Sequence, residues 1–316
     1  MVKATIGMIL SLIAAILALI APAFPETVKD LGQGQAIVTI LPKKGGEPAI
    51  NILQRNIQAK VNGKETTVTG WTRLRDPSGD LELVILIDGS ARTSLGRQLG
   101  DIANFVKSLP ANVKATVGYM DSGRAALAGP LSANHSETAN QLHLPVGMPG
   151  SNSSPYFCLS DLAKHWPSEN RAALREVVLI TDGVDNFYGR YDPNDPYVEA
   201  AIADSIKARL VVYSIYWRDR GRRGNSEYEG YDGQSLLLQT TQATGGKSFD
   251  EGIGEPLSFS PFFDEIAQRL QNQYLLSFHS VLKGKSEIQS LEFKIGNSDA
   301  EVSAPKRVLV EPLSGE

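Results

Sequence analysis

The strongest constraint on the fold is an unbroken apolar run at residues 83–87 that ends in Asp88, Gly and Ser90. Apolar side chains at every position, rather than at every second one, are typical of a strand that is covered on both faces, as in a parallel sheet. A second run of this kind, residues 177–180, ends two positions later in Asp182. Because the carboxyl ends of such strands face the ligand crevice of a doubly wound sheet, Asp88 and Asp182 are expected to converge there.

The middle of the chain alternates strand and helix patterns, as a parallel sheet with crossover helices requires. Its helix signals include Pro155 at a first-turn position and Pro110 directly after a helical run. The predicted strands are residues 83–88, 113–120, 125–131, 177–181 and 210–217, and the predicted helices are residues 95–109, 136–142, 155–166, 198–209, 234–243 and 260–272.

Both ends of the chain alternate apolar with polar residues instead, which predicts antiparallel strands. Residues 36–71 include Asn62-Gly63, a pair that accepts the positive φ angles of a type I′ hairpin turn. About forty residues bury too little apolar area to fold alone, so they need a partner, and further strand patterns occur after residue 273. We therefore expect a small antiparallel β-sandwich, with residues 35–75 as its first half and 274–312 as its second. The α/β domain, residues 80–273, would be inserted between the two halves.

Three segments resemble the von Willebrand factor A domain and its metal-ion-dependent adhesion site: Asp88-Gly-Ser90-Ala-Arg92, Ser153-Ser154-Pro-Tyr, and Leu179-Ile-Thr-Asp182-Gly. The resemblance covers roughly residues 80–275. Two later segments, Ala243-Thr-Gly-Gly-Lys-Ser-Phe249 and Gln273-Tyr-Leu-Leu-Ser-Phe278, are similar to those of a bacterial secreted branch of that family. The resemblance implies a doubly wound, mostly parallel sheet, and a protein ligand bound at its carboxyl edge.

The resemblance also implies a Mg²⁺ site formed by Asp88, Ser90, Ser154 and Asp182, which supply the hard oxygen ligands that this ion prefers. The chain departs from the family at Arg92, which stands where the second serine of Asp-x-Ser-x-Ser belongs. At roughly 5 Å and an effective dielectric constant near 20, an arginine would repel a dication by on the order of 6 kcal/mol. Two readings stay open: the site holds Mg²⁺ with water in place of the lost hydroxyl, or Arg92 neutralises the two aspartates in a metal-free site.

The N-terminus has the parts of a secretory signal, namely Lys3, an apolar stretch at residues 6–20 and the small residues 21–23. Residues 1–23 are therefore a predicted signal peptide, and an uncleaved signal anchor is the alternative. Either version places the protein outside the cytosol, as a secreted, periplasmic or cell-envelope protein, with any membrane contact through this segment. A net charge of −4 gives no electrostatic reason to expect nucleic acid as a partner, because its binders need a basic face.

Three further features have competing interpretations. Cys158, the only cysteine, lies among apolar residues at helical spacing and is predicted to be a buried hydrophobe rather than a reactive thiol. Residues 217–233 mix arginines, acids and aromatics, as a recognition loop or a solvated loop would. The acid-rich residues 182–195 lack the regular ligand spacing of a calcium loop, which favours a solvated loop there.

The sequence contains none of the common catalytic motifs, neither His-Glu-x-x-His, Gly-x-Ser-x-Gly, a Walker loop nor a dinucleotide fingerprint. We therefore expect a binding protein, not an enzyme, that mediates adhesion or another protein–protein interaction. A metal-free structural or assembly module of the bacterial cell envelope is the alternative. A hydrolase that uses Ser90 is a third class, and it would lose its activity in Ser90→Ala.

Overall fold

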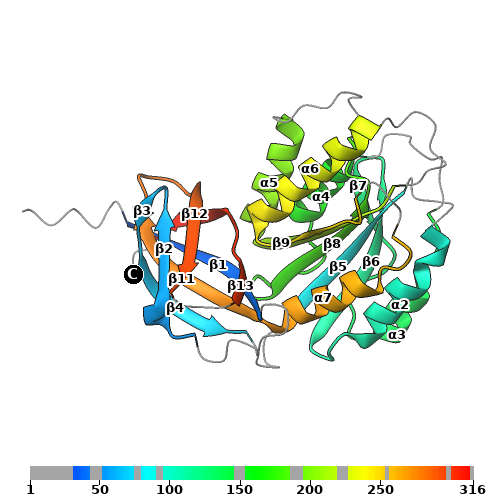
Figure 1. The fold of residues 1–316 in the computed structure, drawn as a ribbon, viewed down its shortest axis with the longest axis horizontal. Coiled ribbons are helices and arrows are strands. Elements are labelled where there is room, and N and C mark those ends of the chain that lie inside the picture. Colours follow the sequence, from blue (N-terminus) through cyan, green and yellow to red (C-terminus); the bar gives the residue numbers. More distant parts are fainter. Residues whose placement is uncertain are drawn as a thin grey trace, which may run out of the picture.

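The computed structural model of this chain describes residues 31–42, 52–74, 80–89, 95–145, 154–185, 195–218, 227–252, 256–296 and 300–313. These residues form an α/β unit and an antiparallel β unit that lie next to each other (Figure 1). The predicted signal segment, residues 1–23, lies outside the described residues. Among the described helices, none is long and apolar enough to cross a membrane.

The central sheet of the α/β unit has six strands in the order β10-β9-β8-β5-β6-β7. All neighbours are parallel except β7, which pairs antiparallel with β6. All eight residues of β5 are buried, as the continuous apolar run predicted. The bounds are β5 Leu81–Asp88, β6 Val113–Asp121, β7 Arg124–Leu127, β8 Leu174–Thr181, β9 Leu210–Tyr216 and β10 Ser248–Phe249.

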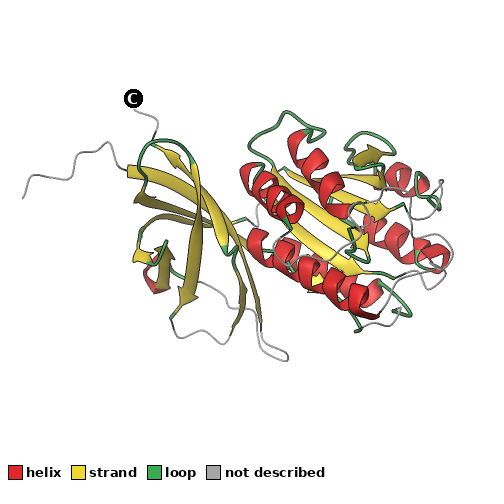
Figure 2. Cartoon of the chain, turned by 90° about the horizontal axis from the view of Figure 1, so that it is seen from above, coloured by secondary structure: helices red, strands yellow, loops and turns green. Residues whose placement is uncertain are grey.

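Helices cover both faces of this sheet, as Figure 2 shows. One face packs on α2, α3 and α7, and the other on α4, α5 and α6, so each face has its own apolar core. The bounds are η4 Leu95–Arg97, α2 Leu99–Ser108, α3 His135–Asn140, α4 Pro155–Lys164, α5 Pro196–Lys207, α6 Glu227–Thr244 and α7 Ser260–Gln271.

The β unit is a single curled sheet in the order β3-β2-β12-β14-β1-β11-β4, with β13 paired to β1. The predicted pairing between the two ends of the chain is present, because β1 lies between β11 and β14, and β2 pairs with β12. The bounds are β1 Leu31–Pro42, η3 Gln54–Asn56, β2 Ile57–Val61, β3 Lys64–Glu65, β4 Thr67–Arg73, β11 Gln273–Val281, β12 Glu287–Ile295, β13 Ala300–Ser303 and β14 Arg307–Pro312.

The predicted sandwich of two stacked sheets is not confirmed. The strand β12 pairs with β14 through its first half and with β2 through its second, so it carries the sheet around a bend. Inside the bend, Trp71 stacks on Tyr274 at 4.7 Å and on Phe293 at 5.7 Å between ring centroids. One curled sheet therefore encloses its own core, where two sheets had been expected.

The predicted hairpin between β2 and β3 is confirmed. Asn62 and Gly63 have φ angles of 48° and 74°, and the flanking Val61 and Lys64 pair antiparallel. Positive φ at both central positions is the geometry of a type I′ turn, which matches the twist of the strands. This short local signal therefore fixes the register of β2 against β3.

Helix α6 begins at Glu227, seven residues before the predicted start at Gln234. Residues 227–233, expected as part of a loop, are therefore helical, while residues 219–226 lie outside the described residues. The helix passes so close to the turn after β8 that a Cβ on Gly233 would lie 2.1 Å from the carbonyl oxygen of Asp182. The missing Cβ of Gly233 therefore permits this contact between helix and turn.

Candidate functional site

The two predicted carboxylates stand at the point where the order of the central sheet reverses. If β5 to β10 are numbered 1 to 6 as they follow in the chain, their order across the sheet is 3-2-1-4-5-6. Strands 1 and 4, which are β5 and β8, are neighbours at the point of reversal. The helix that follows β5 covers one face of the sheet, and the helix that follows β8 covers the other. In sheets of this order the loops after these two strands diverge and leave a crevice where ligands bind. Asp88 ends β5, and Asp182 directly follows β8.

Asp88 is 1% exposed and is joined to the neighbouring strand by Thr181. The Thr181 hydroxyl donates to Asp88 Oδ2 at 2.7 Å and accepts from the Gly183 amide at 3.1 Å. One side chain thus links the end of β5 to the turn after β8. The sequence analysis did not predict this role of Thr181. A hydroxyl residue directly before an aspartate at a strand end could have indicated it.

Asp182 is 4% exposed and shapes the turn in which it lies. Its Oδ1 accepts from the Val184 amide at 3.0 Å, and Gly183 takes a φ of 71° that disfavours other residues. The hydroxyl of Tyr156 on α4 donates to the Gly183 carbonyl at 2.9 Å. The position of Asp182 is therefore fixed by its own turn and by a helix from the covering layer.

Tyr216, at the end of β9, adds a buried phenol to this edge of the sheet. Its pKa is raised to about 12, chiefly by burial and also by the nearby carboxylate of Asp182. Its hydroxyl oxygen has no hydrogen-bond partner among the described residues. A neutral donor of this kind can bond an anionic group, and nothing in the sequence had singled this tyrosine out.

Ser154, the predicted middle ligand, is fully buried at the start of α4. Its Oγ accepts from the Phe157 amide at 3.2 Å, and Pro155 occupies the first helical turn. The serine is thus a helix N-cap. Capping uses one lone pair of the hydroxyl and leaves the second lone pair and the proton for another partner.

The two remaining residues of the motif, Ser90 and Arg92, lie outside the described residues. The predicted ligand role of Ser90 and the substitution of Arg92 for a ligand both stay predictions. The acid-rich stretch after Asp182 is described only at its ends. There Asp195 is the N-cap of α5 and accepts from the Tyr197 amide at 2.7 Å, so it serves the helix.

Cys158 is buried in the apolar core under α4, as predicted. Burial is the main cause that raises the pKa of its thiol far above the ordinary value, and the carboxylate of Asp88 adds to the increase. A thiol kept protonated in this way is a poor nucleophile. Cys158 shares this apolar core with Val84 and Leu86, so α4 covers the face of the sheet on which these β5 residues lie.

The chemistry of the described side chains fits a hard cation in part. Asp88, Asp182 and Ser154 offer carboxylate and hydroxyl oxygens, the ligand types that Mg²⁺ prefers. Among the described residues, no group of three or more histidine, cysteine, aspartate or glutamate side chains is placed to hold a metal ion. A cation here would therefore depend on hydroxyls, water and the segment that contains Ser90.

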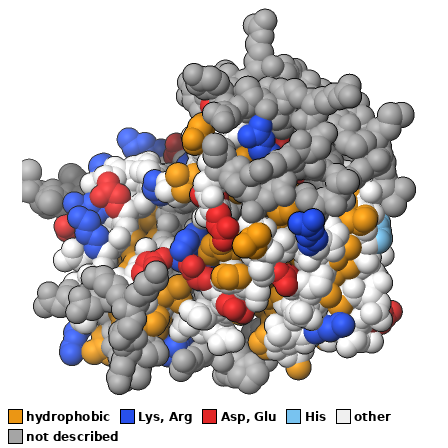
Figure 3. All heavy atoms as spheres, turned by 45° about the vertical axis from the view of Figure 1, so that its right-hand side comes forward, with side chains coloured by type: hydrophobic (Ala, Val, Ile, Leu, Met, Phe, Trp, Pro, Cys, Tyr) orange, Lys and Arg blue, Asp and Glu red, His pale blue; other side chains and the backbone are white. Residues whose placement is uncertain are grey.

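The face in Figure 3 shows acidic and basic side chains interspersed with apolar ones over its described part. On this face, the described residues form no patch of a single charge sign. Charges arranged in this way favour discrete local contacts over a broad electrostatic surface.

No family model matches the sequence, and no curated protein matches it. Solved structures match parts of the chain. An aerotolerance-related membrane protein from Bacteroides fragilis is 15% identical, over 60% of this chain and 98% of its own, with a TM-score of 0.42. The protein BatB from Bacteroides thetaiotaomicron is 17% identical, over 60% of this chain and 97% of its own, with a TM-score of 0.39.

A third solved structure is the proximal thread matrix protein 1 from the mussel byssus, determined with a zinc-occupied MIDAS motif. It is 12% identical, over 66% of this chain and 49% of its own, with a TM-score of 0.45. At these identities and scores, the comparisons assign the chain to no family. A functional assignment must therefore rest on the residues at the carboxyl edge of the central sheet.

Proposed function

We propose that this protein is an exported binding protein of the von Willebrand factor A type, which engages a protein ligand at the carboxyl edge of its central sheet. The observation that supports this function is the convergence of Asp88 and Asp182 at the switch point between β5 and β8. Both carboxylates are less than 5% exposed, and Thr181 bonds one of them while directly preceding the other.

Buried carboxylates that carry a negative charge are commonly stabilised by a positive charge nearby, because taking an ion out of water is costly. In the first version of the proposal the charge is Mg²⁺, held by Asp88, Asp182, Ser90 and Ser154. Mg²⁺ would supply a Lewis-acidic position for a carboxylate of the ligand protein. The chain's own residues fix that position through the turn at Gly183 and the cap at Ser154.

In the second version the charge is the guanidinium of Arg92, and the protein is a metal-free structural or assembly module of the cell envelope. A specific observation favours keeping this version. Asp88, Asp182 and Ser154 each already accept an intramolecular hydrogen bond. Side chains bonded in this way can hold the edge together without a metal.

The melting temperature of wild type and Arg92→Ser, each with a chelator and with millimolar Mg²⁺, tests the proposal. If Mg²⁺ binds, it raises the melting temperature of wild type, and more so of the variant, which regains a hydroxyl and loses a repulsive charge. If Arg92 is the compensating charge, Arg92→Ser is less stable than wild type in chelator, and Mg²⁺ restores it.

A matched control is Arg55→Ser, which removes an exposed arginine on η3 of the β unit, far from the carboxyl edge. Its response to Mg²⁺ should equal that of wild type. Isothermal titration with Mg²⁺ and Mn²⁺ adds a direct measure of binding. No heat, together with the same melting temperature for wild type and Arg92→Ser under both conditions, would refute a charge-compensated site at this edge.

Export is part of the proposal and rests on residues 1–23, with Lys3 before the apolar stretch and small residues at its end. Expression of the full chain in a bacterial host, followed by N-terminal sequencing of the envelope fraction, distinguishes a cleaved signal from a retained anchor. Recovery of the full-length chain from the cytosol alone would contradict export.

A further inference from the structure

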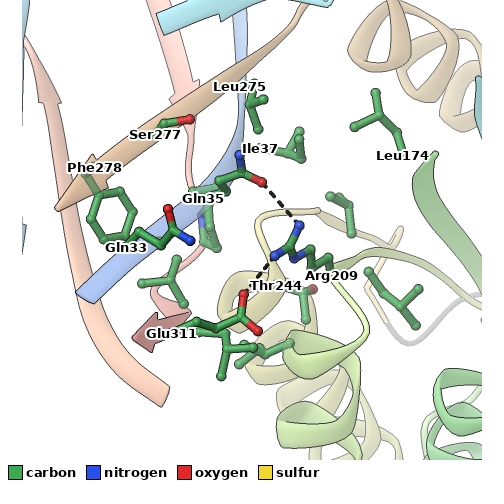
Figure 4. Close-up of a pocket in the computed structure, with 18 of the residues that line it drawn as sticks. Gln33, Gln35, Ile37, Leu174, Arg209, Thr244, Leu275, Ser277, Phe278 and Glu311 are labelled. Atoms are coloured by element: carbon green, nitrogen blue, oxygen red, sulfur yellow. Dashed lines mark hydrogen bonds and ion pairs between the residues drawn. The ribbon is translucent and has the colours of Figure 1, made fainter. Parts of the chain in front are cut away.

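A cavity of about 550 Å³ lies between the two units, at the end of the central sheet opposite the candidate site. Its walls come from the amino ends of β8 and β9 on one side and from the outer face of the curled sheet on the other. Figure 4 shows side chains from both units pointing into it. Its volume falls within the range of small-molecule pockets.

The wall from the curled sheet results from strand alternation. In β1 and β11 the even-numbered residues, such as Val38 and Phe278, are buried in the core of the β unit. The cavity is lined by the outward-facing residues Gln33, Gln35, Ile37, Leu275, Ser277 and His279. Successive cross-strand pairs on this outer face are Ile37 with Leu275, Gln35 with Ser277, and Gln33 with His279.

This wall is therefore graded in polarity. The apolar pair lies nearest the junction with the central sheet, where the next residue along this face, Thr39, is 1% exposed. The amide and hydroxyl pairs lie farther out, and Gln33 is also paired with Glu311 of β14. Leu174, at the start of β8, adds apolar surface from the opposite side. A ligand with an apolar body and a polar head matches such a gradient.

Arg209 projects into the polar part of the cavity from the turn between α5 and β9. Its φ angle of 58° lies in the left-handed region, which is rarely adopted by residues other than glycine, asparagine or aspartate. Its guanidinium donates to Gln35 Oε1 at 3.2 Å and to Glu311 Oε2 at 2.9 Å (Figure 4). The turn thus holds a planar cationic group across the gap between the units.

The charges that line the cavity are unbalanced. Three arginines face a single acid, Glu311, so the lining carries a formal charge of 3 − 1 = +2 with His279 neutral. Arg307 is bonded to Glu199, which lies outside the lining. Arg171 is exposed and makes no hydrogen bond or ion pair with any described residue. The site therefore has a guanidinium available for an anion.

We propose that this cavity binds a small organic anion with an apolar body, of the class of a carboxylate on an alkyl chain. The carboxylate lies between Arg171 and Arg209, since the fork of a guanidinium matches the two oxygens of a carboxylate. The chain packs against Ile37, Leu275 and Leu174. Because the ligand contacts both units of the folded protein, it stabilises their present arrangement.

Decanoate is the test ligand, with decanol as the probe for the alkyl chain without charge and acetate as the probe for charge without the chain. Isothermal titration and thermal shift are measured for wild type, Arg171→Gln and Arg124→Gln. Arg171 is the residue to remove because its side chain supports no other described contact. Arg124, an exposed arginine on β7 at the far edge of the central sheet, is the matched control.

We expect decanoate to bind wild type and to raise its melting temperature, and decanol and acetate to bind at least roughly tenfold more weakly. Arg171→Gln should weaken decanoate binding by about tenfold or more, as the loss of a charge-assisted hydrogen bond predicts. Arg124→Gln should bind like wild type. The proposal would be overturned if decanoate did not bind, or if decanoate and decanol bound equally well. It would also be overturned if Arg171→Gln bound decanoate as tightly as wild type, or if both variants lost the same affinity.

Discussion

Glu176 is a buried acid at the junction of the two units, and its ionisation should govern how stability changes with pH. It lies on β8, is 1% exposed, and accepts from the amide of Gln273 on β11. Burial raises its pKa from 4.5 to about 7, although hydrogen bonds with Gln273 and Tyr213 oppose the increase. Glu176 Oε2 and Gln273 Oε1 have no partner among the described residues, so a proton on the acid supplies a donor to this group.

The sign and size of the effect follow from these values. Below pH 4.5 Glu176 is protonated in both the folded and the unfolded state, and it contributes no penalty. Between pH 4.5 and 7 the unfolded chain loses the proton first, so stability falls as pH rises. A difference of about 2.5 in pKa corresponds to about 3 kcal/mol, reached in full above pH 7.

The substitution Glu176→Gln removes the titration while keeping the shape of the side chain. We expect the difference in unfolding free energy between the variant and wild type to move in favour of the variant by about 3 kcal/mol between pH 4.5 and pH 8. Urea denaturation at several pH values, followed by tryptophan fluorescence, measures this difference, and ionisations elsewhere cancel in it.

A matched control is Gln289→Ala, which removes a buried side chain of β12 that does not titrate. It should lower stability by the same amount at both ends of the pH range. If the difference between Glu176→Gln and wild type stays constant from pH 4.5 to pH 8, the carboxyl is not held in the low-dielectric environment described here.

Two further predictions concern packing. Gly233→Ala should destabilise the fold by about 1–3 kcal/mol, because the added Cβ would overlap the carbonyl of Asp182. Urea denaturation measures this loss. A variant as stable as wild type would mean that α6 does not contact the turn after β8 this closely. Truncation after Phe278 removes β12, β13 and β14 and uncovers apolar residues of β1 and β2, so the product should aggregate. Light scattering and thermal melts test this. A soluble product that unfolds cooperatively would contradict a core shared by both ends of the chain.

The elements that were predictable from sequence are those whose signals are local. The run that became β5 is apolar throughout because both faces of the strand are covered, and Asn62-Gly63 specifies its turn by backbone preference alone. The approach of Asp88 to the turn of Asp182 was predictable for a related reason, since parallel strands deliver their ends to one edge.

Other features depend on which surfaces contact each other in the folded protein, and no local sequence pattern specifies those contacts. Gln33 and Gln35 alternate with buried residues as solvent-facing side chains do, yet in the fold they also line a cavity next to the α/β unit. Ser154 has the sequence context of a helix cap and of a metal ligand at once, and only the cap is visible in the fold. The bend in the β unit likewise depends on β12 changing partners midway, which strand periodicity does not predict.

The pairing of β4 with β11 has a consequence for how the chain folds as it is synthesised. Arg73 lies opposite Tyr274, so strands that are neighbours in space are about 200 residues apart in the chain. At elongation rates of about 5–20 residues per second, β4 waits roughly 10–40 seconds for its partner β11. The α/β unit is continuous in sequence and can fold within that interval, whereas β1 and β4 wait for β11, and β2 has only β3 as an early partner. Nascent chains should therefore depend on holding chaperones for β1 and β4, even though both strands are paired in the finished protein.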